Sequence, residues 1–562
     1  MEQQEKLHWH IPDSTHVEVA ELATTIAQSR GVQIQDYFKL DYTALGDPFD
    51  LPDMKLAIDH LMLVHQRQGR VVVYGDYDID GLTATALLKD ALTQFGFDVT
   101  SYIPDRFEEG YGLHAQALKK LHAQGADTIV TVDCGISATD TIAEAVNDGL
   151  NIIVTDHHAV PEVEPSGAVA LINPLRKQNK YKECSLAGVG VAFALVRALQ
   201  SRNLEKMPFG QEKWLLDLVA LGTICDVVPL TGENRVLASY GLQVARRSRR
   251  AGIRALAKVS NTSLDSLSAS DFGFRFGPRL NAAGRLEHAR VALELLEATE
   301  YDQAYLAAEH LDELNRERRN TTEQIQAAAY KESEQYSTDQ ILVLSSLDWT
   351  HGVVGLVASR VAERFGKPTI ILQEEGEFSK GSARSVGTFS IIDAIRKQAP
   401  LLERYGGHQA AAGITLRTDK IDEFRTALNN NLDADDTSKM QREIIADLWL
   451  ESGFISQEGL DQLETLEPTG QSNPAPIFYL KTRLTQVKPV GQTGDHAQLF
   501  FDIEGQSQRA IAFQAASKWP FLKVGVEIEL LLAIRANEWQ GVRRAQLEVL
   551  DARELVEYDD VG

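Results

Sequence analysis

Acidic and histidine side chains gather directly after three strand-like segments of the chain. The three groups are Asp76, Asp78 and Asp80 after the first segment, Asp133 after the second, and Asp156, His157 and His158 after the third. In an open parallel sheet, ligands bind beyond the carboxyl ends of the strands, so these groups would lie within a few ångströms of one another if their strands are neighbours. Carboxylates gathered in one cleft repel one another and need bound cations. The pattern therefore predicts a divalent-metal site at one edge of a parallel sheet.

The types of ligand favour Mn²⁺ or Mg²⁺. Several carboxylates with one imidazole suit these ions, whereas a structural zinc site would want thiolates. Cys134 and Cys225 each stand beside an aspartate, and the carboxylate is the better ligand for such a metal. Asp226 is a further candidate ligand, because it places a charge within the apolar run 220–230 and a buried carboxylate needs a partner.

Each of these residues also has a structural explanation when it is taken alone. Asp80 precedes Gly81 and could simply cap a helix, and Asp133 could be a turn residue. A single histidine after a strand is more often structural than a metal ligand. The coincidence of all the groups favours the metal site.

Alternating strands and helices predict the sheet that would position these side chains. From about residue 70 to 175, short apolar runs alternate with helical stretches, which indicates a parallel sheet covered on both faces. The expected strands are 70–74, 97–103, 127–132, 151–155 and 168–172, and the expected helices are 82–95, 140–147, 186–201 and 212–223.

A long helix and two further folded parts are expected beyond this sheet. Residues 301–336 contain no Gly or Pro, so we expect one continuous helix there. A second alternating unit follows, with strands 341–344 and 369–372 and helices 353–365, 391–397 and 421–432. The polar run 429–439 marks a boundary. The strand-like segments after it favour a small closed barrel, and they are 443–448, 477–480, 498–503, 509–513, 526–534 and 544–550.

The composition excludes several classes of protein. The 562 residues are 44% hydrophobic and 24% charged, which is ordinary for a globular protein and unlike a collagenous, disordered or disulfide-scaffold chain. No apolar run approaches the roughly 18 residues that a membrane span needs. The start, 1–16, lacks the order of a secretory signal. Three cysteines form no paired framework in a chain of this length, so we expect a reducing cytoplasm.

The charge limits how the chain could bind nucleic acid. Lys and Arg number 56 against 80 Asp and Glu, a net charge of −24, which argues against a nucleic-acid coat but permits a local basic groove. The basic stretch 246–258 and Arg316, Arg318 and Arg319 are candidates for such contacts, and a solvated helix face is the alternative for the stretch. Aromatic residues of the barrel could stack on bases, although the alternating pattern assigns most of them to its core; they are Phe478, Phe500, Phe501, Phe513, Trp519 and Trp539.

At these motifs the chain resembles the DHH phosphoesterase superfamily, and more closely its RecJ family of single-stranded-DNA exonucleases. The resemblance covers about residues 45–555. Its spaced motifs are YGDYDIDG (74–81), PDRFEEGYG (104–112), VDCG (132–135), TDHH (155–158), TICDVVPL (223–230), GPRLNAAGR (277–285), SARS (382–385) and GGHQAAAG (406–413).

The resemblance implies an α/β fold in several domains. A parallel-sheet DHH domain joins, through a long helix, a smaller α/β DHHA1 domain, and an oligonucleotide-binding (OB) barrel follows. The expected boundaries are an N-terminal extension over 1–45, the DHH domain over 46–300, the connecting helix over 301–337, the DHHA1 domain over 338–435 and the barrel over 440–556. Some relatives carry a further C-terminal domain, which we do not expect after this barrel.

The resemblance also implies a two-metal centre with Mn²⁺ or Mg²⁺. The ligands carried over by motif are Asp78, Asp80, Asp133, His157 and Asp226, with Asp76 as a ligand or a support for one. We expect Asp133 to bridge both ions. Asp156 would orient the site, and His158 would contact the scissile phosphate.

The second alternating unit is expected to anchor phosphate. Arg384 offers a planar fork that fits phosphate bidentately, and Gly406 and Gly407 before His408 allow close approach of a ligand to the backbone. The resemblance makes the following residues candidates for holding the 5′ end and adjacent phosphates: Arg106, Arg279, Arg360, Ser382, Arg384 and His408.

The expected activity is 5′-to-3′ degradation of single-stranded DNA to 5′-mononucleotides, in recombination and repair. The resemblance implies single-strand-binding protein and a DNA helicase as partners of a monomer that does not bind membranes. Two alternatives stay open: a small-substrate DHH phosphoesterase, such as an oligoribonuclease or a bisphosphate nucleotidase, and a non-catalytic DNA-binding replication scaffold. The barrel and basic stretch count against the first, and the complete set of acids and histidines counts against the second.

Overall fold

The chain forms two compact units, which are described separately. The first comprises Gln35–Arg316 with Glu467–Ala475, and the second comprises Met1–Ile34, Glu317–Leu466 and Pro476–Gly562. The computed structural model describes residues 7–106, 109–110, 112–202, 207–491, 494–539 and 542–555. No helix within these residues is both long enough and apolar enough to cross a membrane.

A five-stranded parallel sheet is the centre of the first unit. Its strand order is β3-β2-β4-β5-β6, and every neighbouring pair is parallel, which confirms the parallel sheet expected from the sequence. The strands are β2 (Arg70–Gly75), β3 (Asp98–Tyr102), β4 (Ala126–Val132), β5 (Asn151–Thr155) and β6 (Ala170–Ile172).

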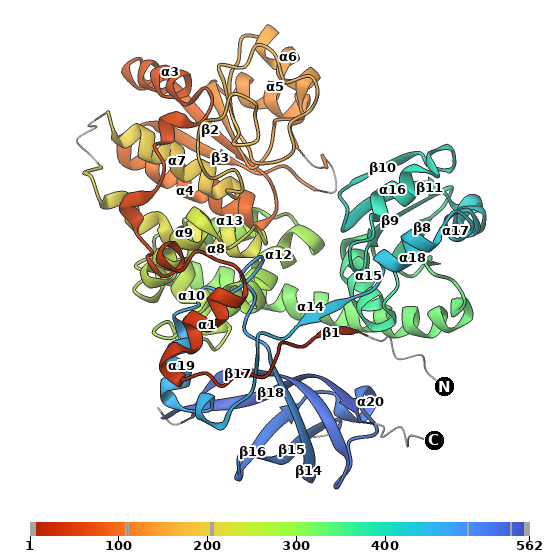
Figure 1. Ribbon diagram of the computed structural model, residues 1–562. Coiled ribbons are helices and arrows are strands. Elements are labelled where there is room, and N and C mark those ends of the chain that lie inside the picture. The colour runs from red at the N-terminus through yellow and green to blue at the C-terminus, as the bar shows by residue number, and fades with distance from the viewer. Residues whose placement is uncertain are drawn as a thin grey trace. The chain divides into compact units, whose positions relative to one another are not determined.

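Helices cover both faces of this sheet. Successive side chains of a strand point to opposite faces, and both sets are apolar here, so each face packs against its own layer of helices. Val71 and Val73 of β2 join the core with α3 (Met54–Gln66), α4 (Ile79–Phe95) and α7 (Gly188–Gln200), whereas Val72 and Tyr74 join the core with α5 (Ala115–Ala123) and α6 (Thr139–Asn147) (Figure 1). The near-continuous apolar strands expected from the sequence are therefore buried on both faces of the sheet.

Helix α4 begins earlier than the sequence pattern predicts. Asp78 is its N-cap, and the carboxylate accepts a hydrogen bond from the amide of Gly81 at 3.0 Å. The predicted start at Leu82 was wrong, because it was placed at the first residue of the apolar helical pattern and the N-cap signal of Asp78 was not considered. Asp80 consequently lies inside the first turn, buried against the core.

The rest of the first unit is helical. The buried helix α8 (Leu216–Cys225) packs on α4 and ends at Asp226. The remaining α-helices are α2 (Ile34–Phe38), α9 (Gly232–Arg246), α10 (Ala251–Val259), α11 (Ala269–Asp271), α12 (Gly277–Leu286) and α13 (Arg290–Glu297).

The basic stretch 246–258 does not form one open basic face. Arg250 is mostly buried and donates a hydrogen bond to Asp90 at 3.2 Å, and its Nε lies 3.4 Å from Asp217. Arg249 lies over the Trp214 ring and Arg254 over the Tyr301 ring. The structure therefore gives Arg250 two carboxylate partners, and contact of the stretch 246–258 with DNA stays a prediction.

The second unit contains a five-stranded sheet of order β10-β11-β9-β8-β7. Its elements are α15 (His351–Phe365), α16 (Ile391–Arg396) and α17 (Ile421–Asn430), with β7 (Leu342–Ser346), β8 (Thr369–Glu375), β9 (Phe378–Arg384), β10 (Arg404–Gly407) and β11 (Ala411–Arg417). The sequence analysis missed the last three strands, because they are rich in Gly, Ala and Ser rather than in β-branched residues. The expected long helix is confirmed as α14 (Tyr301–Ser333) with a 3₁₀ turn over Glu334–Tyr336.

A closed barrel forms the C-terminal part of the second unit. The order is β13-β14-β15-β16-β18-β17, and pairing of β14 with β17 closes it. Its strands are β13 (Leu448–Trp449), β14 (Phe478–Val490), β15 (His496–Ile503), β16 (Gln506–Ala512), β17 (Glu527–Trp539) and β18 (Val542–Glu554). Helices α1 (Leu22–Ser29), α18 (Ala434–Lys439), α19 (Gln457–Glu464) and α20 (Ala515–Lys518) complete the unit.

The segment 443–448 departs from the expected barrel strand. Only its end reaches β13, and β12 (Glu443–Ile445) pairs instead with β1 (His8–His10) in parallel. The expectation failed because its partner lies at the other end of the chain. Most barrel aromatics are in the core as expected: Phe478, Phe501 and Trp519 are buried, whereas Phe513 is exposed. The Trp539 side chain lies outside the described part.

Candidate metal centre

Four structural elements bring the predicted acids and histidines together in the first unit. The loop after β2 carries Asp76 and the cap Asp78, and the first turn of α4 carries Asp80. Asp133 follows β4, the run 156–158 follows β5, and Asp226 caps the end of α8. The carboxyl ends of neighbouring parallel strands therefore meet at one edge, as the sequence predicts.

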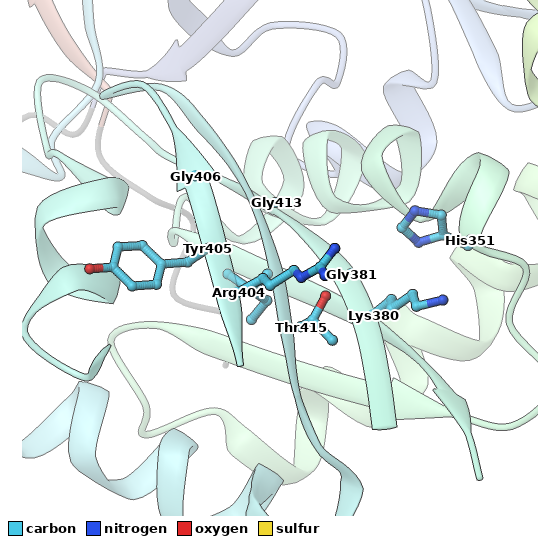
Figure 2. Close-up of a pocket in the computed structure, with 9 residues that line it drawn as sticks. His351, Lys380, Gly381, Arg404, Tyr405, Gly406, Gly413 and Thr415 are labelled. Atoms are coloured by element: carbon cyan, nitrogen blue, oxygen red, sulfur yellow. The ribbon is translucent and has the colours of Figure 1, made fainter. Parts of the chain in front are cut away.

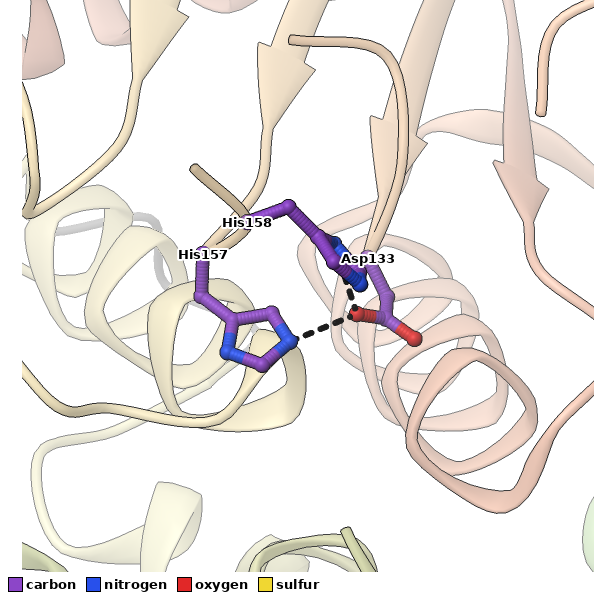
Figure 3. A group of neighbouring side chains, drawn as sticks. All are labelled: Asp133, His157 and His158. Carbon is purple, nitrogen blue, oxygen red and sulfur yellow. Dashed lines mark ion pairs between the residues drawn. The ribbon is translucent and has the colours of Figure 1, made fainter. Parts of the chain in front are cut away.

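The ligand atoms form two triads that fit a metal ion. One atom from each of Asp76, Asp78 and Asp133 lies within 4.8 Å of the others, and the same holds for Asp80, His157 and Asp226. A third group, Asp133 with His157 and His158, meets the same limit (Figure 3). Asp133 thus lies against both triads.

His157 is at the centre of these contacts. Its Nε2 lies 3.1 Å from Asp133 Oδ1, 3.6 Å from Asp226 Oδ2 and 3.7 Å from Asp80 Oδ2. Burial, together with the neighbouring His158, lowers the pKa of His157 to about 4. The ring is therefore neutral near pH 7, which is the form that coordinates a metal.

Three buried polar atoms in this cluster make no hydrogen bond with any residue that the structure describes. They are Asp133 Oδ1, Asp76 Oδ1 and His157 Nε2. Buried polar groups are normally satisfied, because an unpaired one costs about 1–3 kcal/mol. Their convergence from three segments fits a cation that they would share, and the donor set of carboxylates and one imidazole fits Mn²⁺ or Mg²⁺.

In the metal-free protein, the surroundings of four carboxyl groups of this cluster disfavour their ionised form. Burial and neighbouring carboxylates raise the pKa of Asp80 to about 7 and that of Asp226 to about 9. The same causes raise the pKa of Asp76 and of Asp133 well above the ordinary value. A bound cation would relieve this repulsion by supplying the missing positive charge.

Asp156 is the exception, because its hydrogen bonds are complete. Oδ1 accepts from the amide of His157 at 2.7 Å, from the amide of His158 at 3.0 Å and from His158 Nδ1 at 2.8 Å. Oδ2 accepts from the amide of Ile136 at 2.9 Å. The pKa of Asp156 is lowered, since the hydrogen bonds and the charge of His158 outweigh burial. Asp156 therefore fixes the backbone and ring of its neighbours, as expected.

The surroundings of His158 favour its charged form. The hydrogen bond and charge of Asp156 raise its pKa against the opposing effect of burial. The side chain is 37% exposed, so it reaches the open side of the cluster while its Nδ1 is fixed. His158 Nδ1 lies 3.9 Å from Asp133 Oδ1, so a protonated ring would place a positive charge beside that carboxylate.

The backbone is bent where the ligands must converge. Asp133 has φ of 60° and Val227, directly after Asp226, has φ of 60°. Such values are uncommon for non-glycine residues and collect at functional sites. A Cβ atom at Gly188 would lie 2.7 Å from Asp133 Cβ, so glycine is required there for the close approach of α7.

The sequence analysis missed the contribution of α7. The amides of Gly188 and Val189 donate to the two carboxylate oxygens of Asp80, at 2.5 Å and 2.9 Å. Both belong to the first turn of α7, whose free amides and helix dipole favour a negative charge. The Gly-Val-Gly run that opens the helix was the available signal.

Cys134, which is buried, and Cys225, which is partly buried, are poor ligands here. Burial raises the pKa of the Cys134 thiol and of the Cys225 thiol, so both stay protonated. Cys225 Sγ donates to the carbonyl of Phe272 at 3.4 Å. This agrees with the choice of carboxylates over thiolates.

We expect the stability of the metal-free protein to fall as pH rises from 7 to 9. Asp80 and Asp226 have folded-state pKa values above the unfolded value of about 3.9, so their stabilising contribution is lost as pH rises through the folded values. The loss should approach about 1.4 kcal/mol per pH unit while Asp226 is still protonated in the folded protein and ionised in the unfolded chain, and Asp80 should add little above pH 7. His157 has a lowered pKa and acts in the opposite sense only below about pH 6.5, outside this window.

The measurement is urea unfolding at pH 7, 8 and 9, with EDTA and with saturating Mg²⁺. Mg²⁺ should stabilise the protein more at pH 9 than at pH 7. A metal-free stability that is flat or rising over this range would contradict the cluster electrostatics.

Two of the predicted substrate arginines lie in the first unit. Arg106 lies 4.9 Å from the centre of the Tyr77 ring, and its charge opposes in small part the burial and the Asp78 charge that raise the pKa of Asp76, so it lies near the acidic cluster. Arg279 binds Asp312 through Nε and Nη2, both at 2.8 Å. The structure therefore gives Arg279 a carboxylate partner, and its contact with substrate stays a prediction.

The other predicted substrate residues lie in the second unit. Ser382 and Arg384 are on β9, and an added Cβ at Gly355 of α15 would lie within 3.2 Å of Ser382 Oγ and of Arg384 Nη2. Arg384 donates to its neighbour's carbonyl at 2.8 Å, and burial lowers its pKa. No carboxylate in the described part of the chain forms an ion pair with it, which suits a site for an anion.

Arg360 and His408 complete the predicted set. Arg360 donates to Gln326 at 2.6 Å. Burial, together with the charges of Arg360 and Arg319, lowers the pKa of Arg318. His408 lies in the turn between β10 and β11 and is exposed. Their contacts with substrate stay predictions.

Three family models match the chain. They are described as the DHH family N-terminal domain, the DHHA1 domain and the RecJ OB domain, and they match residues 70–223, 338–434 and 446–551.

Curated relatives match over most of the chain. It is 35% identical over 573 residues to the single-stranded-DNA-specific exonuclease RecJ of Escherichia coli strain K12, covering 97% of this chain and 99% of that protein. It is 35% identical over 514 residues to the protein of the same name from Bacillus subtilis strain 168, covering 90% of this chain but 64% of that protein's length.

A solved structure has the same fold. The crystal structure of RecJ in complex with Mn²⁺ from Thermus thermophilus is similar with a TM-score of 0.82 and 29% identity, covering 98% of this chain and 80% of that chain. The expected order of a parallel-sheet domain, a smaller α/β domain and a barrel is thereby confirmed.

Proposed function

The chain belongs to the RecJ family of single-stranded-DNA-specific exonucleases, and we propose that it degrades single-stranded DNA from the 5′ end and releases 5′-mononucleotides in recombination and repair. The observation that carries the proposal is the cluster of buried acids and His157, in which Asp76 Oδ1, Asp133 Oδ1 and His157 Nε2 converge without a hydrogen bond to any residue that the structure describes. The match to an OB domain over 446–551 supports a polymeric substrate over a small one.

The residues would hold two ions, Mn²⁺ or Mg²⁺. Asp76, Asp78 and Asp133 would hold one ion, and Asp80, His157, Asp226 and Asp133 the other. Bound divalent ions supply Lewis acidity, an activated water and charge neutralisation for phosphodiester hydrolysis. The protein's own part is to fix these ligands and to keep His157 neutral.

His158 acts on the substrate in this proposal. Asp156 orients its ring and favours its protonated form, in which it would donate a hydrogen bond to a phosphoryl oxygen as negative charge develops there. Asp133 and Asp156 would thus both be required for the reaction, one as ligand and the other as the residue that positions His158.

Several finer points belong to the same proposal. We propose that the enzyme is a cytoplasmic monomer that works with single-strand-binding protein and a helicase. The domain boundaries proposed from the sequence are 46–300, 301–337, 338–435 and 440–556.

The direct test offers three substrates with Mn²⁺: a 5′-labelled single strand, a 3′-labelled single strand and a blunt duplex. Early release of labelled mononucleotide from the first substrate alone supports both the strand specificity and the direction. Early label release from the 3′-labelled strand, or equal digestion of the duplex, would overturn the proposal.

Replacing Arg384 with alanine should reduce the preference for 5′-phosphorylated ends. The guanidinium is half-buried and pairs with no acid that the structure describes, so a terminal phosphate would gain a charge-assisted hydrogen bond from it. We expect kcat/KM for the 5′-phosphorylated strand to fall about 10–100-fold relative to the 5′-hydroxyl strand.

The matched control is Arg396→Ala. Arg396 is an exposed arginine of the same unit that pairs with Asp393 at 2.7 Å. A ratio between the two ends that is the same in Arg384→Ala, Arg396→Ala and the wild type would exclude Arg384 as the anchor.

A further inference from the structure

One face of the three strands β10, β11 and β9 is partly open. The pairing register of the strands shows which side chains lie on this face. Side chains of directly opposed residues in an antiparallel pair share a face. One row is Arg404, Thr415 and Lys380, the next is Gly406, Gly413 and Ser382, and Ala411 pairs with Arg384 in a third. The rows are two residues apart, or about 7 Å.

The opposite face of the same strands is core. Ala412, Ile414 and Leu416 are buried there in one hydrophobic cluster. On the open face, α15 packs against β8 and β9. A depression of about 310 Å³ remains on the ladder (Figure 2). It is lined by His351 of α15, by the whole first row, by the two glycines of the second row, and by Gly381, Tyr405 and Ile414, whereas Ser382 and Arg384 lie beyond it, next to Gly355 of α15.

The glycines of the middle row are not required by the fold. Neither Gly406 nor Gly413 has a positive φ, and a Cβ added to either would meet no described atom within 4 Å. Glycine in a strand costs stability, so two opposed glycines call for another reason, such as close approach of a ligand to the backbone.

Gly406 and Gly413 form the floor of the depression, and the side chains around this floor suit a long anion. Lys380 and Arg404 stand at one end and Arg384 at the other, with the hydroxyls of Thr415 and Ser382 between them. Glu375 lies 3.6 Å from Lys380 Nζ, but both side chains are more than half exposed, so water screens this pair. The open face is therefore cationic on a chain whose net charge is −24.

A polyphosphate fits this floor better than a nucleobase. The three rows carry no aromatic side chain, and the Tyr405 ring points away from the side on which Arg404, Thr415 and Lys380 stand (Figure 2). The three rows therefore offer a base no aromatic ring to stack on, and the aromatic rings beside the depression are those of His351 and Tyr405. Phosphate oxygens gain from close backbone approach, from hydroxyls and from Lys and Arg.

We propose that this face binds a 5′-terminal triphosphate of the substrate strand, with Arg384 and Ser382 at the phosphate nearest the nucleoside and Lys380 and Arg404 at the outer phosphates. The inference rests on the proposed 5′-end anchor and widens its substrate class. The enzyme then accepts a 5′-triphosphorylated single strand. Water attacks the first internucleotide phosphorus and the bond from that phosphorus to the 3′ oxygen breaks, so the first product is a nucleoside 5′-triphosphate and the remaining strand carries a 5′-phosphate.

The test compares single strands that end in 5′-triphosphate, 5′-monophosphate or 5′-hydroxyl. The wild type should release nucleoside triphosphate from the first strand with kcat/KM within about tenfold of the monophosphorylated strand. The double variant Lys380→Ala, Arg404→Ala should lose about 10–100-fold on the triphosphorylated strand and change less than about threefold on the monophosphorylated one. Wild-type enzyme that rejects the triphosphorylated end, or a double variant that loses both substrates equally, would overturn the inference.

A second variant and a binding measurement separate this inference from the nuclease proposal. Gly413→Val fills open space and should keep the wild-type melting temperature while losing the triphosphorylated substrate. Calorimetry of inorganic tripolyphosphate with the metal-free protein needs no nuclease activity. The wild type and Arg396→Ala should bind it alike, and the Lys380, Arg404 double variant about tenfold more weakly. Equal binding by all three proteins would contradict the site even if the exonuclease activity were established.

Discussion

Asp133→Asn should abolish metal-dependent cleavage and, at the same time, stabilise the metal-free protein. Asp133 lies against both candidate metal triads, so its loss should remove ligands from both ions. We expect kcat/KM to fall about 10³-fold or more, because several kcal/mol of transition-state stabilisation depend on the ions.

The gain in stability follows from the same burial. The Asp133 carboxyl is buried among Asp80, Asp78 and Asp76, which raise its pKa, and Asn removes the charge at constant shape. Without metal at pH 8, the free energy of unfolding should rise by about 1–3 kcal/mol. Asn also tolerates the φ of 60° at this position, whereas alanine would add backbone strain.

The measurements are exonuclease kinetics in Mn²⁺ and urea unfolding in EDTA. Asp140→Asn is the matched control, because Asp140 is exposed on α6. Near-normal cleavage by Asp133→Asn would remove Asp133 from the centre. A metal-free variant less stable than the wild type would show that the carboxylate is not under repulsion.

Asp156→Asn should have the opposite effect on stability and also reduce activity. Three donors converge on one carboxylate oxygen and the amide of Ile136 on the other, so an asparagine must turn its own NH₂ toward a donor. We expect a loss of about 2–4 kcal/mol in the free energy of unfolding, in the absence of metal as well as in its presence.

The activity loss should be about 10–100-fold, since Asp156 positions His158 rather than holding a metal in this account. The pKa of His158, followed by NMR, should fall in the variant because its charged partner is gone. Unchanged stability together with an unchanged His158 pKa would contradict the positioning role.

The sequence predicted the parallel sheet and its edge because both depend on local patterns. A short segment of sequence is enough to recognise an apolar strand or the helix that follows it. The same is true of the acids that come soon after Tyr74, Val132 and Thr155. The sheet order then places β2, β4 and β5 side by side, which is what brings the three groups together.

Features that depend on distant partners escaped the sequence analysis. The α7 amides that hold Asp80 lie 108 and 109 positions along the chain, and β12 pairs with a strand near the N-terminus. Arg250 looks like part of a basic face until Asp90 and Asp217 are seen beside it. Strands β9 to β11 were missed because their glycines and small residues weaken the strand pattern, and the open glycine row on them is the basis of the triphosphate site.

Anomalous diffraction from crystals grown with Mn²⁺ tests the central claim most directly. The account predicts two peaks, one between Asp76, Asp78 and Asp133 and one between Asp80, His157 and Asp226, with Asp133 beside both. Crystals at saturating Mn²⁺ that show these side chains around water alone, or manganese bound only elsewhere, would contradict it.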